Sequence, residues 1–260
     1  MNQIHSISFI GSGNVATHLA IALKNAGFEI HEIYSRTFEN AKKLAGKVNA
    51  KAIHTIDEMD TSADLYILSI PDGAIEDFIE GFPNIKGIMV HTSGITPMKA
   101  LDKMQHYGVF YPLQTFSRQR GVDLSDVPFC IEASSGDIIV QLKSVAQKLS
   151  GSVYEIHSEQ RKYLHLTAVL VNNYTNYLYQ MAFDILKAKN IDEQLLIPLI
   201  EETVSKIKSL HPSTAQTGPA RRNDLKTIEK HNRLLDEFPD YKELYKIFAG
   251  QLIKKYNEQL

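Results

Sequence analysis

The sequence lacks several features that would define a protein's class at once. Its 260 residues include one cysteine, Cys130, which excludes an internal disulfide and a metal site built from several cysteines. No apolar run approaches the roughly 20 residues that a membrane span needs, and no basic and then apolar segment at the start suggests a signal peptide. The formal net charge of −2 gives no electrostatic case for binding nucleic acid or an anionic membrane. These absences favour a cytoplasmic protein that holds no metal and acts on a small molecule.

What is present is the composition of an ordinary globular protein, with a change of pattern near residue 157. Hydrophobic residues make up 43% and charged residues 22%, a balance that can bury a core. Apolar segments typical of buried strands alternate with helical segments up to that point, and only helical periodicity follows. The sequence therefore predicts a doubly wound α/β domain over residues 1–157 and an all-α domain over residues 158–260.

The strongest local motif lies over residues 4–16, IHSISFIGSGNVA. An alternating apolar segment ends at Gly11 and a helical segment follows, so G-x-G-x-x-A stands at the junction of a strand and a helix. Gly11 permits a tight turn, Gly13 lets a pyrophosphate approach the backbone, and Ala16 lets the helix pack closely on the strand. The helix N-terminus would bind phosphate, and the alternative is a glycine turn that binds no ligand. The expected cofactor contacts here are Gly11, Ser12, Gly13, Asn14 and Val15.

The end of the second predicted strand, residues 29–34, distinguishes between nicotinamide cofactors. An acidic residue at that strand end binds the ribose of NAD in this fold, but here Ser35 and Arg36 follow the strand. Because the planar guanidinium suits a phosphate, the pattern favours NADP over NAD. Glu32 is the competing acidic residue, but it lies two positions inside the strand. The alternative for Arg36 is a surface position at the start of the next helix.

Two further predicted strands, residues 64–70 and 85–90, bring other residues to the same crevice. Ligands of open parallel sheets bind beyond the carboxyl ends of the strands, so the residues that follow these strands should lie near the glycine turn. His91 is a candidate for catalysis, and the alternative is a strand-end histidine that bonds to the backbone. The next segment, residues 98–106, is predicted to be helical. The expected cofactor contacts at these strand ends are Ile70, Pro71, Asp72, Thr92 and Ser93.

The helical half begins with a long predicted helix over residues 158–189. Apolar residues occupy most of its faces, which is typical of a buried helix. His165, Asn172 and Asn176 are polar exceptions, and their spacing places them on one face of an α-helix. They either bond to neighbouring helices or face a cleft, because a buried polar group without a partner is costly.

The rest of the helical half carries several signals for helix ends. Pro198 should kink or restart a helix, Asp224 can cap the next one, and Asp240 with Glu243 resembles a capping box. The loop over residues 211–224 contains Gly-Pro and two arginines. It is either a solvated connection or a loop that presents donors to an anionic or carbonyl-bearing substrate. The predicted helices cover residues 192–210, 225–235 and 241–256.

The motif FIGSGNVATHLA and the Ser35-Arg36 strand end resemble the cofactor domain of a known superfamily. It includes pyrroline-5-carboxylate reductase, the beta-hydroxyacid dehydrogenases and deazaflavin-dependent NADP reductases, which join a Rossmann domain to an all-helical domain. The resemblance implies a Rossmann-like N-terminal domain and a helical domain of the 6-phosphogluconate dehydrogenase C-terminal-like kind. It also implies NADP as cofactor and a homodimer formed through the helices.

Almost the whole chain is similar to an uncharacterised bacterial family, labelled NADP oxidoreductase, that pairs a Rossmann-like domain with a helical domain of unknown function. The family more often has histidine where Tyr111 stands and a Tyr-His pair where Leu164 and His165 stand. Its pattern points to Asn173, whereas helical geometry places Asn172 on the face of His165, and both stay candidates. The motifs that carry the resemblance are residues 111–116 (YPLQTF), His165 with Ala168 and Asn173, and residues 217–224 (TGPARRND) with His231.

The first functional hypothesis is an NADP(H)-dependent oxidoreductase that transfers a hydride to or from a small carbonyl, hydroxyl or imine substrate. His165 is the first candidate for proton donor, because histidine is the side chain that titrates near neutral pH. Asn173 would hold the carbonyl or a water, and Arg221 or Arg222 would clamp a carboxylate. The relatives often have a catalytic lysine on the long helix, and Lys162, near its start, ranks below His165. The competing hypotheses are a sensor that binds NADP without turnover and, more weakly, a methyl-donor enzyme with the same glycine turn.

Overall fold

The computed structural model describes residues 3–117 and 119–257. The chain divides into two compact units, Met1–Asn172 and Asn173–Leu260. The sequence predicts a boundary after residue 157, whereas in the structure residues 158–172 belong to the first unit. The reason is packing, because Leu164 joins a buried cluster with side chains of the sheet. No helix among the described residues is long and apolar enough to cross a membrane.

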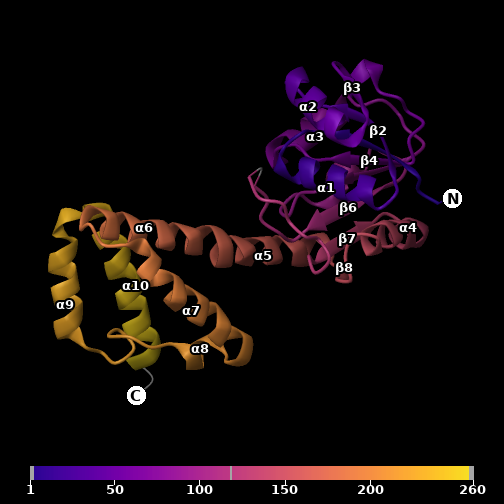
Figure 1. Ribbon diagram of the computed structural model, residues 1–260. Helices are drawn as coiled ribbons and strands as arrows, with labels where there is room; N and C mark the ends of the chain where they lie inside the picture. Colours follow the sequence, from indigo (N-terminus) through magenta and orange to yellow (C-terminus); the bar gives the residue numbers. More distant parts are fainter. Residues whose placement is uncertain (1–2, 118, 258–260) are drawn as a thin grey trace. The chain divides into compact units, whose positions relative to one another are not determined.

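Within the described residues, one sheet of eight strands forms the centre of the first unit. The strands are β1 (Ser6–Ile10), β2 (Glu29–Tyr34), β3 (Lys51–Ile53), β4 (Leu65–Leu68), β5 (Ile88–His91), β6 (Tyr107–Pro112), β7 (Phe129–Ala133) and β8 (Val153–Glu155). Their order across the sheet is β3-β2-β1-β4-β5-β6-β7-β8 (Figure 1). Neighbours pair in parallel except β6 and β7, which are antiparallel. The predicted doubly wound sheet is confirmed, with β7 and β8 reversed at one edge.

Helices cover both faces of this sheet. One face carries α1 (Asn14–Asn25), α2 (Phe38–Val48) and α4 (Gly136–Gln147), whose side chains share a buried cluster with the strands. The other face carries α3 (Ile75–Glu80) and the 3-10 helix Met98–Leu101. Because both faces are covered, the central strands are apolar along their length, and every residue of β4 is buried.

The prediction of a helix over residues 98–106 is wrong. Only Met98–Leu101 is helical, and its geometry is 3-10. The amide of Asp102 closes on the carbonyl of Lys99 in a three-residue step, and β6 begins soon afterwards at Tyr107. Runs of 3-10 helix are short because their hydrogen-bond geometry is poor. The other described 3-10 helices of the first unit are Ile56–Glu58 and Asp72–Ala74.

The helix predicted over residues 158–189 consists of three elements. α5 (Ser158–Ala168) is followed by the π-helical turn Val169–Tyr174 and then by α6 (Thr175–Ala188). A π turn takes more residues than an α turn. The seven-residue spacing that predicts one face for His165 and Asn172 assumes an unbroken α-helix, and the π turn interrupts it. The choice between Asn172 and Asn173 stays a prediction.

The prediction that this segment is buried is also wrong for the single chain. Tyr163 is 71% exposed, Val171 73% and Tyr174 59%. Arg161 and Met181 are the buried residues of α5 and α6. Apolar residues occur around the segment, but the described neighbours cover only part of its circumference.

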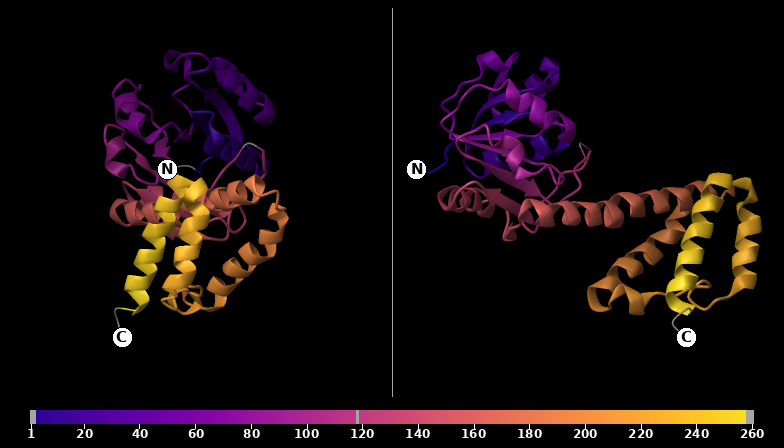
Figure 2. Two further views of the ribbon diagram at one scale, coloured as in Figure 1. Left: turned by 90° about the vertical axis from the view of Figure 1, so that its left-hand side faces the viewer. Right: turned by 180° about the vertical axis from the view of Figure 1, so that it is seen from behind.

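The second unit contains only helices among its described residues. They are α6, the 3-10 helix Glu193–Leu196, α7 (Ile197–Ser209), α8 (Pro212–Ala215), α9 (Leu225–Leu234), the 3-10 helix Leu235–Glu237 and α10 (Pro239–Asn257). α9 and α10 lie side by side in opposite directions (Figure 2). Ala220, Ile228 and Ala249 form a small buried cluster there, and His231 Nδ1 lies 2.7 Å from Tyr245 Oη.

The observed starts of these helices test three predictions made from the sequence. Pro198 stands in the first turn of α7, so it restarts the helix and does not kink it. Asp224 caps α9 by accepting the amide of Thr227 at 3.1 Å, which confirms that prediction. The capping box at Asp240 is wrong, because α10 begins at Pro239, whose fixed φ suits a first helical position.

Candidate functional site

The glycine turn after β1 has a backbone that only glycine adopts freely. Gly11 has a φ of 111°, and its amide donates to the Tyr34 carbonyl at 2.8 Å. A Cβ on Gly11 would lie 2.1 Å from the carbonyl oxygen of Ser69, so the strand ends approach each other through this glycine. Gly13 caps α1, and a Cβ there would meet no atom within 4 Å. The helix N-terminus is therefore open to a ligand at Gly13.

A cleft of about 430 Å³ surrounds this turn. It brings together most of the predicted cofactor contacts, namely Gly11, Ser12, Gly13, Ser35, Arg36, Ile70 and Pro71. Sequence reasoning missed the remaining lining residues, which are Tyr34, Thr37, Asn40, Ser69, Ala74 and Phe78. Ser69 had a usable signal, because it is a hydroxyl residue just beyond the end of β4. Asn40 had another, because it lies in the first turn of α2, four residues after Arg36.

Three other predicted contacts lie close to the cleft without lining it. The side-chain amide of Asn14 donates to the Phe116 carbonyl at 2.8 Å, so it binds the loop after β6. Val15 packs against the buried cluster beneath α1. Asp72 begins the 3-10 helix Asp72–Ala74 directly after Pro71. For Asn14 and Val15 the backbone amide at the helix start is the group that a phosphate can reach.

Thr92 and Ser93, at the end of β5, differ from each other. The hydroxyl oxygen of Thr92 lies 3.1 Å from that of Ser69, so Thr92 adjoins the cleft through a lining residue. The Ser93 hydroxyl donates to Thr96 Oγ1 and accepts the amides of Ile95 and Thr96. Ser93 is therefore occupied within its own turn and shapes the loop.

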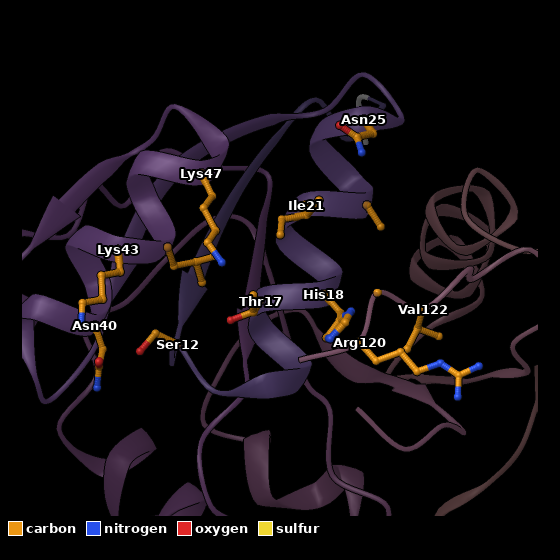
Figure 3. Close-up of a pocket in the computed structure, with 13 residues that line it drawn as sticks. Ser12, Thr17, His18, Ile21, Asn25, Asn40, Lys43, Lys47, Arg120 and Val122 are labelled. Carbon is orange, nitrogen blue, oxygen red and sulfur yellow. The ribbon is translucent and has the colours of Figure 1, made fainter. Parts of the chain in front are cut away.

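A second cleft, of about 560 Å³, adjoins the first, because Ser12 and Asn40 line both. It lies between α1, α2 and the loop that carries Arg120 (Figure 3). Lys43, Lys47 and Arg120 line it, and no carboxylate is among its described lining residues. This charge would favour an anion beside the cofactor cleft. Sequence reasoning missed it, because surface lysines on a helix are a weak signal.

His165 lies between the β5 exit loop and β6. Its Nδ1 is 3.2 Å from Tyr111 Oη, and the two rings meet edge to face with centroids 6.1 Å apart. Burial raises the pKa of Tyr111 to about 12, so the phenol keeps its proton at neutral pH. A Cβ on Gly94 would lie 2.4 Å from His165 Nδ1. The sequence did not predict that these three residues meet.

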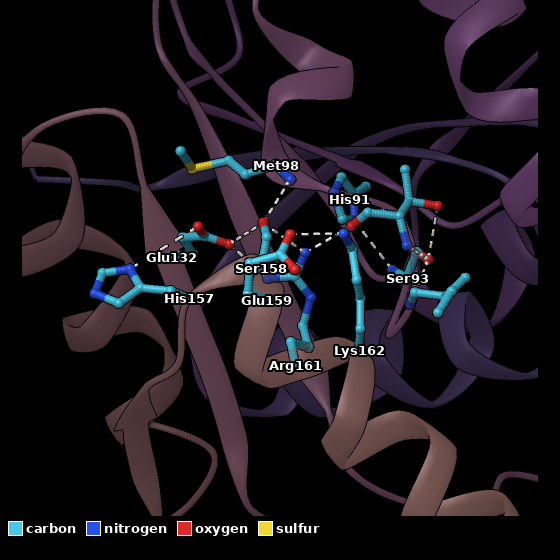
Figure 4. A network of polar contacts seen from close by, with 11 residues as sticks. His91, Ser93, Met98, Glu132, His157, Ser158, Glu159, Arg161 and Lys162 are labelled. Atoms are coloured by element: carbon cyan, nitrogen blue, oxygen red, sulfur yellow. Dashed lines mark hydrogen bonds and ion pairs between the residues drawn. The ribbon is translucent and has the colours of Figure 1, made fainter.

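A buried ion pair holds the first turn of α5 (Figure 4). Arg161 is fully buried, and it donates to Glu132 Oε2 and to the Thr96 carbonyl, each at 2.6 Å. The Ser158 hydroxyl also donates to Glu132 at 2.6 Å and accepts the amide of Met98 at 2.9 Å. Burial acts to raise the pKa of Glu132, but the hydrogen bonds from Ser158 and Arg161 hold it below its usual range. The cluster therefore ties α5 to β7 and to the loop after β5.

Two of the candidate catalytic residues have other partners. His91 is fully buried, and its Nδ1 accepts the amide of Ser93 at 3.1 Å. Burial, with the nearby Arg161 charge, lowers the pKa of His91 to about 4, so it is neutral. This matches the backbone-bonded alternative for His91. Lys162 pairs with Glu159 at 2.7 Å on the surface of the same helix. His165, which follows on α5, keeps a ring nitrogen, Nε2, with no described partner.

The remaining candidates lie at the unit boundary or beyond it. Asn172 ends the first unit and Asn173 begins the second, both within the π turn. Arg221 belongs to the second unit, where its guanidinium stacks 4.3 Å from the ring centroid of Tyr256. In the same loop Asn223 has a positive φ of 56°. The loop is therefore folded back on α10, and its arginine is partly engaged.

The cofactor cleft fits a dinucleotide phosphate on its own chemistry. The backbone is open at Gly13, a side chain is excluded at Gly11, and the guanidinium of Arg36 lies at the end of β2. No carboxylate lines the described part of the cleft. Glu32, the competing acid, is buried and bonded to Lys51 at 2.9 Å and to the Asp60 amide at 2.8 Å. A 2′-phosphate is thus favoured over a free ribose hydroxyl.

Comparisons with protein families cover most of the chain in two parts. Residues 6–90 match the model described as NADP oxidoreductase, coenzyme F420-dependent. Residues 127–252 match a domain of unknown function, DUF2520. A search of curated proteins finds no match.

Solved structures extend the likeness to the full chain. The putative NADP oxidoreductase BF3122 from Bacteroides fragilis is 44% identical, over 96% of this chain and 98% of its own, with a TM-score of 0.90. Protein TM1727 from Thermotoga maritima is 23% identical over 95% and 99%, with a TM-score of 0.77. A reductive aminase from Aspergillus terreus, in complex with NADPH and ethyl-5-oxohexanoate, is 16% identical over 98% and 95%, with a TM-score of 0.73. The last two show a shared fold.

Proposed function

Because the chain belongs to the NADP oxidoreductase family that includes the Bacteroides fragilis protein, we propose that it transfers a hydride between NADP(H) and a small carbonyl, hydroxyl or imine substrate. The observation that carries the proposal is the open backbone at Gly13, beside Ser35 and Arg36, in a cleft lined by no described carboxylate. Bound NADPH supplies the hydride. The fold shared with a reductive aminase supports a ketone or an imine as the acceptor.

His165 is the proposed proton donor to the reduced product. Its Nδ1 faces Tyr111, and its Nε2 has no hydrogen bond to any described residue. Nε2 is therefore the nitrogen that can reach a substrate. A well-placed general acid contributes roughly 10²–10⁴-fold to the rate. We further propose that Asn173 binds the substrate carbonyl or a water and that Arg221 binds a carboxylate, on the strength of the family motifs that contain them.

The test is NADPH oxidation by the full chain against a panel of keto acids, imines and aldehydes. One class should be reduced with consumption of NADPH. His165→Ala should then lower kcat by about 10²-fold or more while the Kd for NADPH stays within about twofold. Tight NADPH binding without oxidation of any panel member would instead support the sensor hypothesis. A parallel loss of cofactor affinity in His165→Ala would show that His165 acts in binding and not in proton transfer.

A homodimer formed through the helical half is also proposed. Its support is the set of exposed apolar side chains on α5, the π turn and α6, which are Tyr163, Leu166, Leu170, Val171, Tyr174, Tyr177 and Leu178. Monomers seldom expose large apolar patches. The assignment to the 6-phosphogluconate dehydrogenase C-terminal-like helical fold and the cytoplasmic location are further proposals, the second supported by the single, buried Cys130.

A further inference from the structure

The imidazole of His165 lies directly against the main chain of the loop that follows β5. A Cβ built on Gly94 would be 2.4 Å from Nδ1, 2.6 Å from Cγ and 2.9 Å from Cβ of His165. Real Cβ atoms do not approach other atoms so closely. Any side chain at position 94 would therefore displace His165, and glycine is required here by contact, since its backbone does not adopt a positive φ.

Tyr111 fixes which nitrogen of His165 is available. The phenol is buried and keeps its proton, so it can donate to Nδ1 or accept from a protonated Nδ1 at 3.2 Å. The bond therefore persists in both protonation states of His165. Nε2 is left without a described partner in each case, and a proton can leave from it or arrive at it.

Arg161 fixes the helix on which His165 stands. It lies one turn earlier on α5, at spacing i, i+4, so the two side chains share a face. Its guanidinium binds Glu132 of β7 and the Thr96 carbonyl, and Thr96 belongs to the same loop as Gly94. The cluster therefore fixes α5 against the loop segment on which the imidazole of His165 rests.

We propose that Gly94 and Arg161 are positioning residues that hold His165 with Nδ1 on Tyr111 and Nε2 free for a substrate, an inference that rests on the proposed function for the role of Nε2. Neither residue needs to touch the reacting atoms. Gly94 acts by leaving room for the ring, and Arg161 acts by fixing the helix. Both act through the geometry of His165, where a displacement of about 1 Å costs on the order of 10²-fold in rate.

The test is the nitrogen NMR spectrum of the full chain labelled with ¹⁵N-histidine, with His165 assigned by the signal that His165→Gln removes. In the wild type the His165 Nδ1 signal should have the chemical shift of a hydrogen-bonded ring nitrogen, which we call the Nδ1 signature. Tyr111→Phe removes the hydrogen-bond partner and should abolish this signature. Gly94→Ala should give the same loss. The matched control is Gly136→Ala, because a Cβ at Gly136 meets no atom within 4 Å, and it should keep the wild-type spectrum.

Arg161→Lys tests the role proposed for Arg161. It also keeps the proposal testable if Gly94→Ala does not fold. The lysine keeps the charge but cannot donate to Glu132 and Thr96 with a planar fork, so the Nδ1 signature should weaken while the Kd for NADPH stays within about twofold. A wild-type Nδ1 signature in Gly94→Ala or in Arg161→Lys overturns the corresponding assignment. If the spectra are as expected but no substrate is reduced by NADPH, the positioning proposal stands and the proposed function is refuted. Failure of the positioning proposal and failure of the proposed function therefore give different results.

Discussion

The two units of this chain bury their apolar side chains to different extents. The first unit has a sheet covered on both faces and large buried clusters that include β1, β4 and β5. In the second unit the buried hydrophobic residues among those described are Met181, Ala220, Ile228 and Ala249. A unit with so small a core and so many exposed apolar side chains gains little from the hydrophobic effect by itself. The first unit therefore buries its apolar side chains within one chain, whereas the described part of the second unit leaves many of its own exposed.

The largest expected effect is a loss of stability when the buried cation of the first unit, Arg161, is replaced. Arg161→Met leaves the Glu132 carboxylate, whose side chain is 11% exposed, without its cation, and breaking a largely buried pair in this way costs about 3 kcal/mol or more. Urea unfolding at pH 7 measures the loss. Because the folded-state pKa of Glu132 is lowered, the ion pair stabilises above the usual carboxyl pKa and loses its effect as pH falls through the folded value. The gap between variant and wild type should therefore narrow in acid, and a constant gap would assign the loss to packing.

The next effect concerns the glycine turn. Gly11→Ala places a Cβ 2.1 Å from the Ser69 carbonyl at a φ of 111°, and such crowding costs roughly 1–3 kcal/mol. NADPH affinity should fall with stability, because the turn that carries Gly13 moves. Gly46→Ala is the control, since its Cβ would meet no atom within 4 Å. Unchanged NADPH binding in Gly11→Ala, measured by fluorescence titration, would contradict the cofactor assignment of this turn.

A smaller effect should sharpen the contrast between the units. Tyr174→Lys with Tyr177→Lys places charges among the exposed apolar side chains of the second unit. We expect the protein to shift from dimer to monomer in size-exclusion chromatography with light scattering, while NADPH binding by the first unit persists. The control adds the same two lysines at exposed polar positions of α6, as in Gln180→Lys with Asn176→Lys, and should leave the oligomeric state unchanged. A wild-type protein that is monomeric at all concentrations would refute the proposed homodimer.

The sequence predicts the first unit well because its signals are local. The glycine turn, the alternating strands and the Ser35-Arg36 strand end each lie within a few neighbouring residues. The group around His165 could not be predicted in this way, because Tyr111 and His165 are 54 positions apart and Arg161 and Glu132 are 29 apart. Their meeting depends on the order of the strands in the sheet.

The helical half was predicted less well for a related reason. Periodicity assumes one helical repeat, and the π turn Val169–Tyr174 changes the repeat inside an otherwise regular segment. No residue type marks such a turn. The apolar pattern of the same segment predicted burial, but a sequence does not say whether the covering surface comes from its own chain.

The most direct test of the central claim is the ratio of Kd values for NADPH and NADH, measured by fluorescence titration on the wild type and on Arg36→Gln. A hydrogen bond to a charged group contributes about 1.5–3 kcal/mol, so the wild type should bind NADPH about tenfold or more tightly than NADH. Arg36→Gln should bring the ratio close to one, whereas Lys42→Gln on the neighbouring helix α2, a residue that lines neither cleft, should preserve it. Equal affinities in the wild type, or a ratio unchanged by Arg36→Gln, would contradict an NADP site at this strand end.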